Sequence, residues 1–377
     1  MAVPASVRGG GVPVTRRLLV ARPVRTAAGA LGVGLALMLI VLLSGLWAGV
    51  QQRVTVYEDH LGTDLVVVPP GTDSLVADPG ALPAGAAAAV ARTAGVAAAD
   101  PIRTLYLILE LDDGKAAVAA AASQPGRPGG PWALAAGRRP RADDEVALDA
   151  VFAREHGLTL GDRLPVLGHD MRVVGLTDDT TMFMTPLLFT TTHAMTGMLR
   201  AAGTTGSVLV TLNPGADRAA VAARLTAAGL TVRTPAQLHQ AALTLATRIY
   251  GSPVRLMVGV AFVAGTLIVA LVAHTRVTEQ QRDLGILKAM GATPGRLRSI
   301  ALGETAALTG LGAVAALLLT GAARAVLAWW WPAFPVAVTA PTLAATAAAA
   351  AAMAVVAAWL PMRRLARLDP ATAFRSR

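Results

Sequence analysis

The chain has 377 residues, of which 54% are hydrophobic and 15% charged, and it carries a net charge of +10 with no cysteine. The absence of cysteine excludes a disulfide framework and thiolate metal sites, even for a domain outside the cell. The apolar composition instead predicts a membrane protein of mixed α+β class. Four transmembrane helices are expected, with one large extracytoplasmic domain inserted between helices 1 and 2.

Four apolar stretches are long enough to cross a bilayer, which takes about 20 residues of helix. They cover residues 27–50, 254–273, 300–323 and 339–360. The first stretch could instead be a cleavable signal peptide, but it exceeds the roughly 7–15 apolar residues of a signal core, which favours a retained anchor. Pro361 is expected to end the fourth span.

Positive charge is concentrated beside these spans. Residues 1–26, 274–299 and 361–377 together hold 15 of the 33 Lys and Arg residues but 3 of the 23 acidic residues. Because basic loops stay on the cytoplasmic side, both termini and the central loop are expected inside the cell, in a protein that crosses the plasma membrane several times. Residues 51–252 and 324–338 then face outward. Topology accounts for the whole positive charge, so nucleic-acid binding is not needed to explain it.

Two amphipathic helices are predicted where the outer domain meets the membrane. The first span is expected to continue outward over 51–61, and a second helix over 235–252 begins at a capping box with proline at its first position. Their apolar stripes repeat with the same spacing. The stripes are Val50, Val54, Tyr57 and Leu61 in the first helix, and Leu238, Ala242, Leu245 and Ile249 in the second. We interpret the helices as paired stalks that relay motion; the alternative is a pair of ordinary surface helices.

The outer domain contains two β-α-β patterns, each with an apolar strand, a helix and a second strand. The first covers 64–68, 82–93 and 104–111, and the second covers 207–212, 217–228 and 230–233. Two such units, split across the chain, predict a ferredoxin-like layer.

The segment between these two units is predicted to be mostly β. Strands at 166–168 and 171–176 flank an expected turn at His169-Asp170, and 183–190 is predicted to be another extended segment.

Catalytic and metal-binding motifs are missing. No G-x₄-G-K-[ST] phosphate loop occurs, so the chain is not expected to bind ATP by that route or to be an enzyme. The six histidines lack metal-ligand spacing. The acidic run Asp143-Asp144-Glu145 is interpreted as a solvated turn. Trp132, at the end of a Pro/Gly-rich link over 126–132, is interpreted as a packing residue.

The cytoplasmic loop over 274–299 carries a short charged helix. Thr278 and Gln281 form a capping box that would start this helix, and Gly291 is placed to end it. An apolar stripe is formed by Leu284, Leu287 and Met290. A charged helix with one apolar stripe at a membrane edge is typical of a docking element, whereas the alternative is a solvated or lipid-facing loop.

Within this loop, the run RDLGILKAMGA resembles the R-E-[IL]-G-[IL]-L-[KR]-A-[LM]-G-A segment of MacB/FtsX-like ABC transporter permeases. The chain departs from that pattern at Asp283, where Glu is usual and the carboxylate reaches further. The C-terminal run PMRRLARLDPATAFR similarly resembles the family's P-x₂-[RK]-[RK]-A-x₃-[DN]-P-x₂-A-[LF]-[RK] tail. The resemblance covers essentially the whole chain, and the mostly β segment is similar to the family's second outer subdomain, beside a ferredoxin-like porter part.

The resemblance implies a coupling helix that seats in a cleft of a separate ATP-binding subunit. Its residues are Glu279, Arg282, Asp283, Leu284, Gly285, Leu287, Lys288, Met290 and Gly291. The corresponding tail residues are Arg363, Arg364, Asp369 and Pro370. ATP and Mg would be bound by that partner, and no cofactor by this chain.

The resemblance also implies a homo- or heterodimer of permeases in the lipid bilayer that works by mechanotransmission. Because the spans hold almost no ionisable residue, an amphiphilic or membrane-derived cargo such as a lipid, a drug or haem is expected. DevC-type glycolipid exporters and HrtB-type haem exporters have this size and a separate ATPase. The alternative is an FtsX-like signalling permease that activates an outer cell-wall hydrolase or acts with another accessory protein. Neighbouring genes would distinguish the two.

Overall fold

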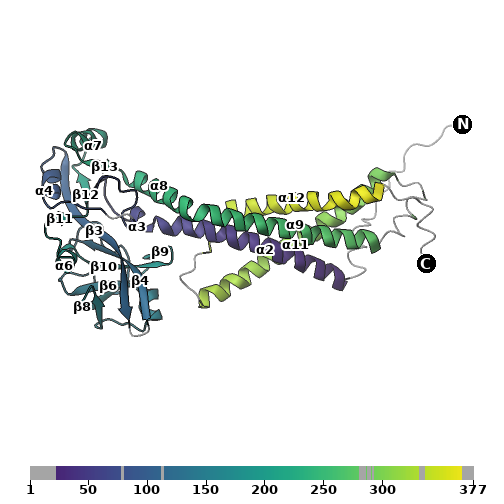
Figure 1. Cartoon of the computed structure of the whole chain (residues 1–377), viewed down its shortest axis with the longest axis horizontal. Helices are drawn as coiled ribbons and strands as arrows, with labels where there is room; N and C mark the ends of the chain where they lie inside the picture. The colour runs from purple at the N-terminus through teal and green to yellow at the C-terminus, as the bar shows by residue number, and fades with distance from the viewer. Residues whose placement is uncertain are drawn as a thin grey trace. The chain divides into compact units, whose positions relative to one another are not determined.

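A computed structural model of the chain describes residues 23–77, 80–111, 114–279, 286, 290, 293–330 and 336–366. The chain divides into two compact units. One contains most of the long apolar helices, and the other contains the mixed α/β domain of Gly49–Ser252 (Figure 1).

Among the described residues, four helices are long and apolar enough to cross a membrane. They are α2 (Pro23–Val54), α9 (Ser252–Glu279), α11 (Pro294–Trp330) and α12 (Ala340–Ala366) (Figure 1). The mean hydropathy of their spans lies between 1.7 and 2.6. The chain is therefore a membrane protein, as its composition predicts.

Small residues let these helices approach one another closely. A Cβ added at Gly34 of α2 would lie 2.9 Å from the Cβ of Ala315, and one at Gly312 of α11 would lie 2.6 Å from Val33. Real Cβ atoms essentially never come so near, so a larger residue would separate the two backbones. Val33 also belongs to an apolar core with Met353 of α12.

Two predicted helix ends are wrong. α9 continues through Thr278, whose hydroxyl donates to the carbonyl oxygen of His274 at 2.9 Å instead of capping a new helix. A hydroxyl bonded four residues back is satisfied inside a helix, so this threonine does not force a helix start. α12 continues through Pro361 to Ala366; the ring fixes φ in the helical range, although the missing N–H and the clash of the ring with the carbonyl of residue 357 disfavour this position.

A continuous helical run leads from the outer domain into α9. It starts with α8 (Pro235–Ala246), which has the predicted capping box at Thr234, and passes through a π-helical turn, η1 (Thr247–Gly251). The π turn lies directly before Pro253, which has no N–H to donate to residue 249 in a regular helix. The second predicted stalk and the second span are therefore parts of one 41-residue apolar run, Pro235–Thr275.

The second unit contains a four-stranded antiparallel layer in the order β13-β1-β12-β3. Its elements are β1 (Leu65–Val68), α4 (Ala86–Ala91), β3 (Val96–Leu111), β12 (Ser207–Leu212), α7 (Arg218–Ala227) and β13 (Thr231–Arg233). This order is the ferredoxin-like topology, so the predicted layer is confirmed. β1 is buried on both faces, which explains its unbroken apolar run LVVV.

The first β-α-β unit differs from its predicted bounds. The residues expected to begin its helix form a short strand, β2 (Leu82–Pro83), paired with β11 (Thr204–Thr205). Pro83 disfavours helical backbone at the residue before it, so α4 starts later. β3 starts at Val96, well before 104, because Pro101 does not interrupt its pairing with β12.

A mostly β subdomain continues from the same sheet. β3 pairs with β12 up to Ile102 and with β4 (Gly114–Ser123) from Arg103 onward, so one strand serves both parts. The order then runs β4-β10-β6-β8-β5, with β7 paired to β8 and β9 to β10. These elements are β5 (Leu134–Gly137), β6 (Glu145–Asp149), α5 (Ala150–Glu155), β7 (Arg163–Val166), β8 (His169–Thr177), β9 (Thr181–Met182), β10 (Thr185–Thr191) and α6 (Thr192–Met198).

Two turns in this subdomain lie elsewhere than predicted. The β7–β8 hairpin turns at Leu167 and Gly168, with φ values of 50° and 78°, and His169 and Asp170 belong to β8. Two successive positive φ values are typical of a type I′ turn, whose twist matches that of paired strands. The extended segment predicted over 183–190 is interrupted at Met184, which has a φ of 52° between β9 and β10.

Candidate functional site

The predicted ATPase-coupling helix lies mostly outside the described residues. Those outside are Arg282, Asp283, Leu284, Gly285, Leu287, Lys288 and Gly291, together with Asp369 and Pro370 of the tail. Glu279 ends α9, and Arg363 and Arg364 lie near the end of α12. Met290 is 71% exposed, and its N–H donates to the carbonyl oxygen of Ile286 at 2.9 Å. The docking stripe stays a prediction.

The two stalks pack against each other within the second unit. Tyr57 of α3 (Val56–Asp59), Leu61 just beyond it and Leu238 of α8 are each 1% exposed and share one apolar core. The Oδ1 atom of Asp59 also lies 2.7 Å from the Nδ1 atom of His239. The end of the first stalk is thus held against the start of the second by both apolar and polar contacts.

Neither stalk follows its predicted stripe throughout. α2 ends at Val54 and α3 follows after Thr55, so the first stalk is not one helix through residue 61. In the second stalk, Ala246 is 2% exposed whereas Ile249 is 52% exposed. The π turn contains more residues than an α turn and rotates the side chains that follow, so the spacing of a regular helix stops there.

α3 also buries a carboxyl group. Glu58 is 1% exposed, and neither carboxylate oxygen has a hydrogen-bond partner among the described residues. Burial raises the pKa of Glu58 to about 7, because the charged form loses its hydration. On the preceding residue, the Tyr57 hydroxyl donates to the carbonyl oxygen of Gly129 at 3.0 Å. Glu58 is therefore a group at the stalk junction that titrates near neutral pH.

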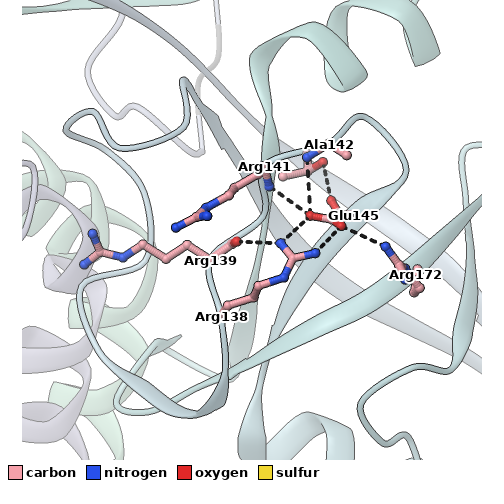
Figure 2. Close-up of polar contacts among 7 residues, drawn as sticks. Arg138, Arg139, Arg141, Ala142, Glu145 and Arg172 are labelled. Carbon is pink, nitrogen blue, oxygen red and sulfur yellow. Dashed lines mark hydrogen bonds and ion pairs between the residues drawn. The ribbon is translucent and has the colours of Figure 1, made fainter.

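Glu145 is not in the solvated turn that the acidic run predicts. It is 2% exposed, and its carboxylate accepts hydrogen bonds from the side chains of Arg138 and Arg172 and from the backbone N–H groups of Arg141 and Ala142 (Figure 2). These bonds, led by that from Arg138, lower the pKa of Glu145 to about 2. Arg172 reaches it because the two residues are register partners on the parallel strands β6 and β8.

The described residues of the outer domain form packed cores and charge pairs. No group of three or more His, Asp or Glu among them could hold a metal ion. Trp132 packs on the core that contains Tyr57 and Phe189, as its position in the link predicts.

Four apolar spans with a ferredoxin-like layer and a mostly β subdomain between the first two define a membrane permease with a large outer domain. Two family models match this chain: the MacB-like periplasmic core domain over residues 26–228 and the FtsX-like permease C-terminal region over residues 255–370. The chain belongs to the MacB/FtsX-like family of ABC transporter permeases.

Relatives along nearly the full length carry the same description. An uncharacterised ABC transporter permease of Mycobacterium tuberculosis is 27% identical over 350 residues, which cover 90% of this chain and 93% of the relative. One of Mycobacterium bovis has the same identity and coverage.

Two solved outer domains were also matched. The periplasmic region of MacB from Actinobacillus actinomycetemcomitans aligns at 12% identity and a TM-score of 0.37, covering 48% of this chain and 92% of that chain. The extracellular domain of the ABC-type transporter YknZ from Gram-positive bacteria aligns at 13% identity and a TM-score of 0.36. The alignment covers 46% of this chain and 99% of that chain.

Proposed function

We propose that this chain is the permease subunit of an ABC exporter that works by mechanotransmission. A separate ATP-binding subunit would bind ATP and Mg, and its closure would push on the coupling helix and the tail. The observation that carries the proposal is the run Pro235–Thr275, which joins the outer domain to a span without an intervening loop. A continuous helix passes displacement along its axis, whereas a flexible linker would absorb it.

The cargo is proposed to be amphiphilic or membrane-derived, such as a lipid, a drug or haem. Each candidate span has a window of 18 residues with at most two charged side chains. A path for an ion or a sugar would need polar groups along the spans, because water is absent from the bilayer core. A cargo that enters from the membrane or at the outer surface needs no such path.

The working unit is proposed to be a dimer of this chain, or of this chain and a related permease, in the plasma membrane. Apolar side chains along α9 support this arrangement, since Leu256, Val260, Leu267 and Leu271 are each at least 61% exposed. Such side chains need either lipid or a second permease against them.

Reconstitution with the cognate ATP-binding subunit tests this function. Proteoliposomes would contain the two subunits and a fluorescent amphiphile in the membrane. We expect ATP to drive the amphiphile out of the bilayer, and no release with an ATP-binding subunit that cannot hydrolyse ATP. Hydrolysis without release, for every amphiphile class tried, would contradict export. Activation of an added cell-wall hydrolase under those conditions would assign the signalling function instead.

A further inference from the structure

A cavity of about 380 Å³ opens in the second unit between the segment that leads into β1 and the loop that joins β4 to β5. Three of its walls are formed by His60, Trp132 and Arg139. At about 30 Å³ per water molecule, such a volume corresponds to roughly a dozen waters, which is more than a bare inorganic ion needs. It falls in the size range of sites for small organic ligands.

The walls of this cavity are fixed by the core. Gly129 has a φ of 84°, and a Cβ there would lie 2.8 Å from the side chain of Ile102, so the loop sits directly on the sheet. The Trp132 ring stacks on His60 with centroids 4.4 Å apart, and Phe189 meets it edge-on at 5.7 Å. The space is thus already formed before a ligand enters.

Positive charge dominates the lining. Two guanidinium groups, those of Arg127 and Arg139, border the cavity, and no Asp or Glu is among the described residues that line it. Arg127 has one acidic neighbour, Asp100, whose Oδ1 atom lies 3.4 Å from the Arg127 Nε atom. Arg139 is exposed, and its side chain leads away from the Glu145 cluster in Figure 2. Its guanidinium has no hydrogen bond or ion pair with any described residue.

Neither ring of the lining adds a donor for an anion. The Nδ1 atom of His60 lies 2.8 Å from the carbonyl oxygen of Val56, so Nδ1 carries the proton and the unprotonated Nε2 is an acceptor. The Trp132 Nε1–H is buried without an acceptor in the described part of the chain. The indole therefore contributes the face of an apolar ring to the lining, and not an accessible donor.

We propose that this cavity binds a small organic anion, with a phosphate or carboxylate group held by Arg139 and Arg127 and an apolar body against Trp132 and Phe189. Oxygen acceptors are the match for guanidinium donors, and a ring or short chain fills the volume that the anionic group leaves. The ligand is a soluble organic anion or the headgroup of an anionic lipid. This site does not depend on whether the permease exports or signals.

The test uses the full chain in nanodiscs of phosphatidylcholine and titration calorimetry with three probes. These are phenyl phosphate, short-chain phosphatidylglycerol and benzyl alcohol, which is neutral. We expect the two anions to bind and benzyl alcohol not to bind. Arg139→Gln should raise the Kd of the anions about tenfold, because a charge-assisted hydrogen bond is lost. Arg141→Gln removes the same charge two residues away, outside the cavity, and should leave the Kd unchanged.

Each outcome decides the proposal. Tighter binding of phenyl phosphate identifies a soluble ligand, and tighter binding of phosphatidylglycerol identifies a lipid headgroup; both keep the anion site. No binding of either anion would overturn it. So would equal weakening by Arg139→Gln and Arg141→Gln, which would mean a general surface charge effect. Because the Arg139 side chain is exposed, the thermal unfolding midpoint of Arg139→Gln should match that of the wild type, which separates lost binding from lost folding.

Discussion

Two buried glutamates show how the surroundings, and not the residue type, set the charge state. Glu58 and Glu145 are 1% and 2% exposed, respectively. Burial without a partner raises the pKa of Glu58 to about 7, whereas hydrogen bonds from Arg138 and neighbouring backbone lower that of Glu145 to about 2. At neutral pH Glu145 is therefore charged and paired, while Glu58 is close to its titration midpoint.

Glu58→Gln is expected to remove a pH dependence of stability. Because its folded pKa lies above the ordinary value of 4.5, the folded chain keeps a proton that the unfolded chain releases between about pH 4.5 and 7. Stability therefore falls as pH rises through that window, by up to about 3 kcal/mol, and stays lower above it. In Glu58→Gln, the thermal unfolding midpoint measured between pH 5 and 8 should lose this slope. Glu155→Gln replaces an exposed glutamate and should retain the wild-type slope. If Glu58→Gln also retained the slope, another group would be responsible for the pH dependence.

Glu145→Gln is expected to act with the opposite sign. Because the folded pKa of Glu145 is depressed, its contribution is present above about pH 4.5 and is lost as the pH falls toward 2. Loss of its charged hydrogen bonds should lower the free energy of unfolding at pH 7 by about 1.5–3 kcal/mol and reduce the sensitivity to acid. Denaturant unfolding of the full chain at pH 7 and pH 4 measures both effects. Asp144→Asn replaces an exposed neighbouring residue and should have little effect on the free energy of unfolding. Equal losses of stability in the two variants would contradict the role of Glu145.

These residue roles lie beyond what local sequence can show. Glu145 sits in an acidic run that has the composition of a surface turn, and its partner Arg172 comes from a strand 27 residues further along the chain. Its pairing depends on the parallel register of β6 and β8. Glu58 borders the apolar stripe of the first stalk, but its charge alone favours an exposed position, and the elements packed on α3 bury it. Non-local pairing determines both environments.

At the scale of elements, the predictions succeeded where one local signal was sufficient. The spans are identified by apolar length, and the two β-α-β units by alternating strand and helix patterns that give the observed sheet order. The predictions failed where a tertiary contact overrode a local signal. β3 continues across Pro101 because β12 pairs with it. The first stalk is a separate failure: it breaks at Thr55 although its apolar spacing continues.

Leu287→Asp is expected to abolish binding of the ATP-binding subunit. If Leu287 belongs to the docking stripe, the change would bury a charge in an apolar contact, at a cost of several kcal/mol. Co-purification from membranes measures the loss, and the unfolding midpoint of the outer domain should be unchanged. Ile286→Asp is the matched control, because it adds the same charge one position off the predicted stripe. Wild-type binding by Leu287→Asp would rule out the coupling assignment.

Whether the second stalk transmits motion can be tested by making its helix, α8, more flexible. Ala241→Gly with Ala242→Gly in α8 should cost about 1 kcal/mol each in helix stability, which loosens the helix without unfolding the domain. ATPase binding and ATP turnover should persist, while release of the amphiphile in proteoliposomes falls. Ala222→Gly with Ala223→Gly in α7 makes the same change in a helix outside the stalks. Full transport by the α8 variant at normal expression would show that these helices only connect, and that force travels by another route.

For the whole molecule, charge and apolar length together determine which segments face which side. Along the sequence, apolar spans lie between residues 51–252 and the basic segments at 274–299 and 361–377, which hold ten of the Lys and Arg residues. Because basic segments are retained in the cytoplasm, the unit that contains Gly49–Ser252 should lie outside. The cavity proposed for an organic anion would then be open to the outer solution or the outer face of the membrane.

The natural lack of cysteine makes this orientation directly measurable, since each single-cysteine variant carries one reactive thiol. Asn213→Cys and Glu155→Cys replace exposed residues of the second unit and should react with a membrane-impermeant maleimide on intact cells. Thr293→Cys and Ser376→Cys should react only after the cells are opened, because the positive-inside rule places both positions in the cytoplasm. Labelling of either of these two in intact cells, with a cytoplasmic marker protein unlabelled, would contradict the four-span orientation. It would also remove the coupling helix from the side where ATP is available.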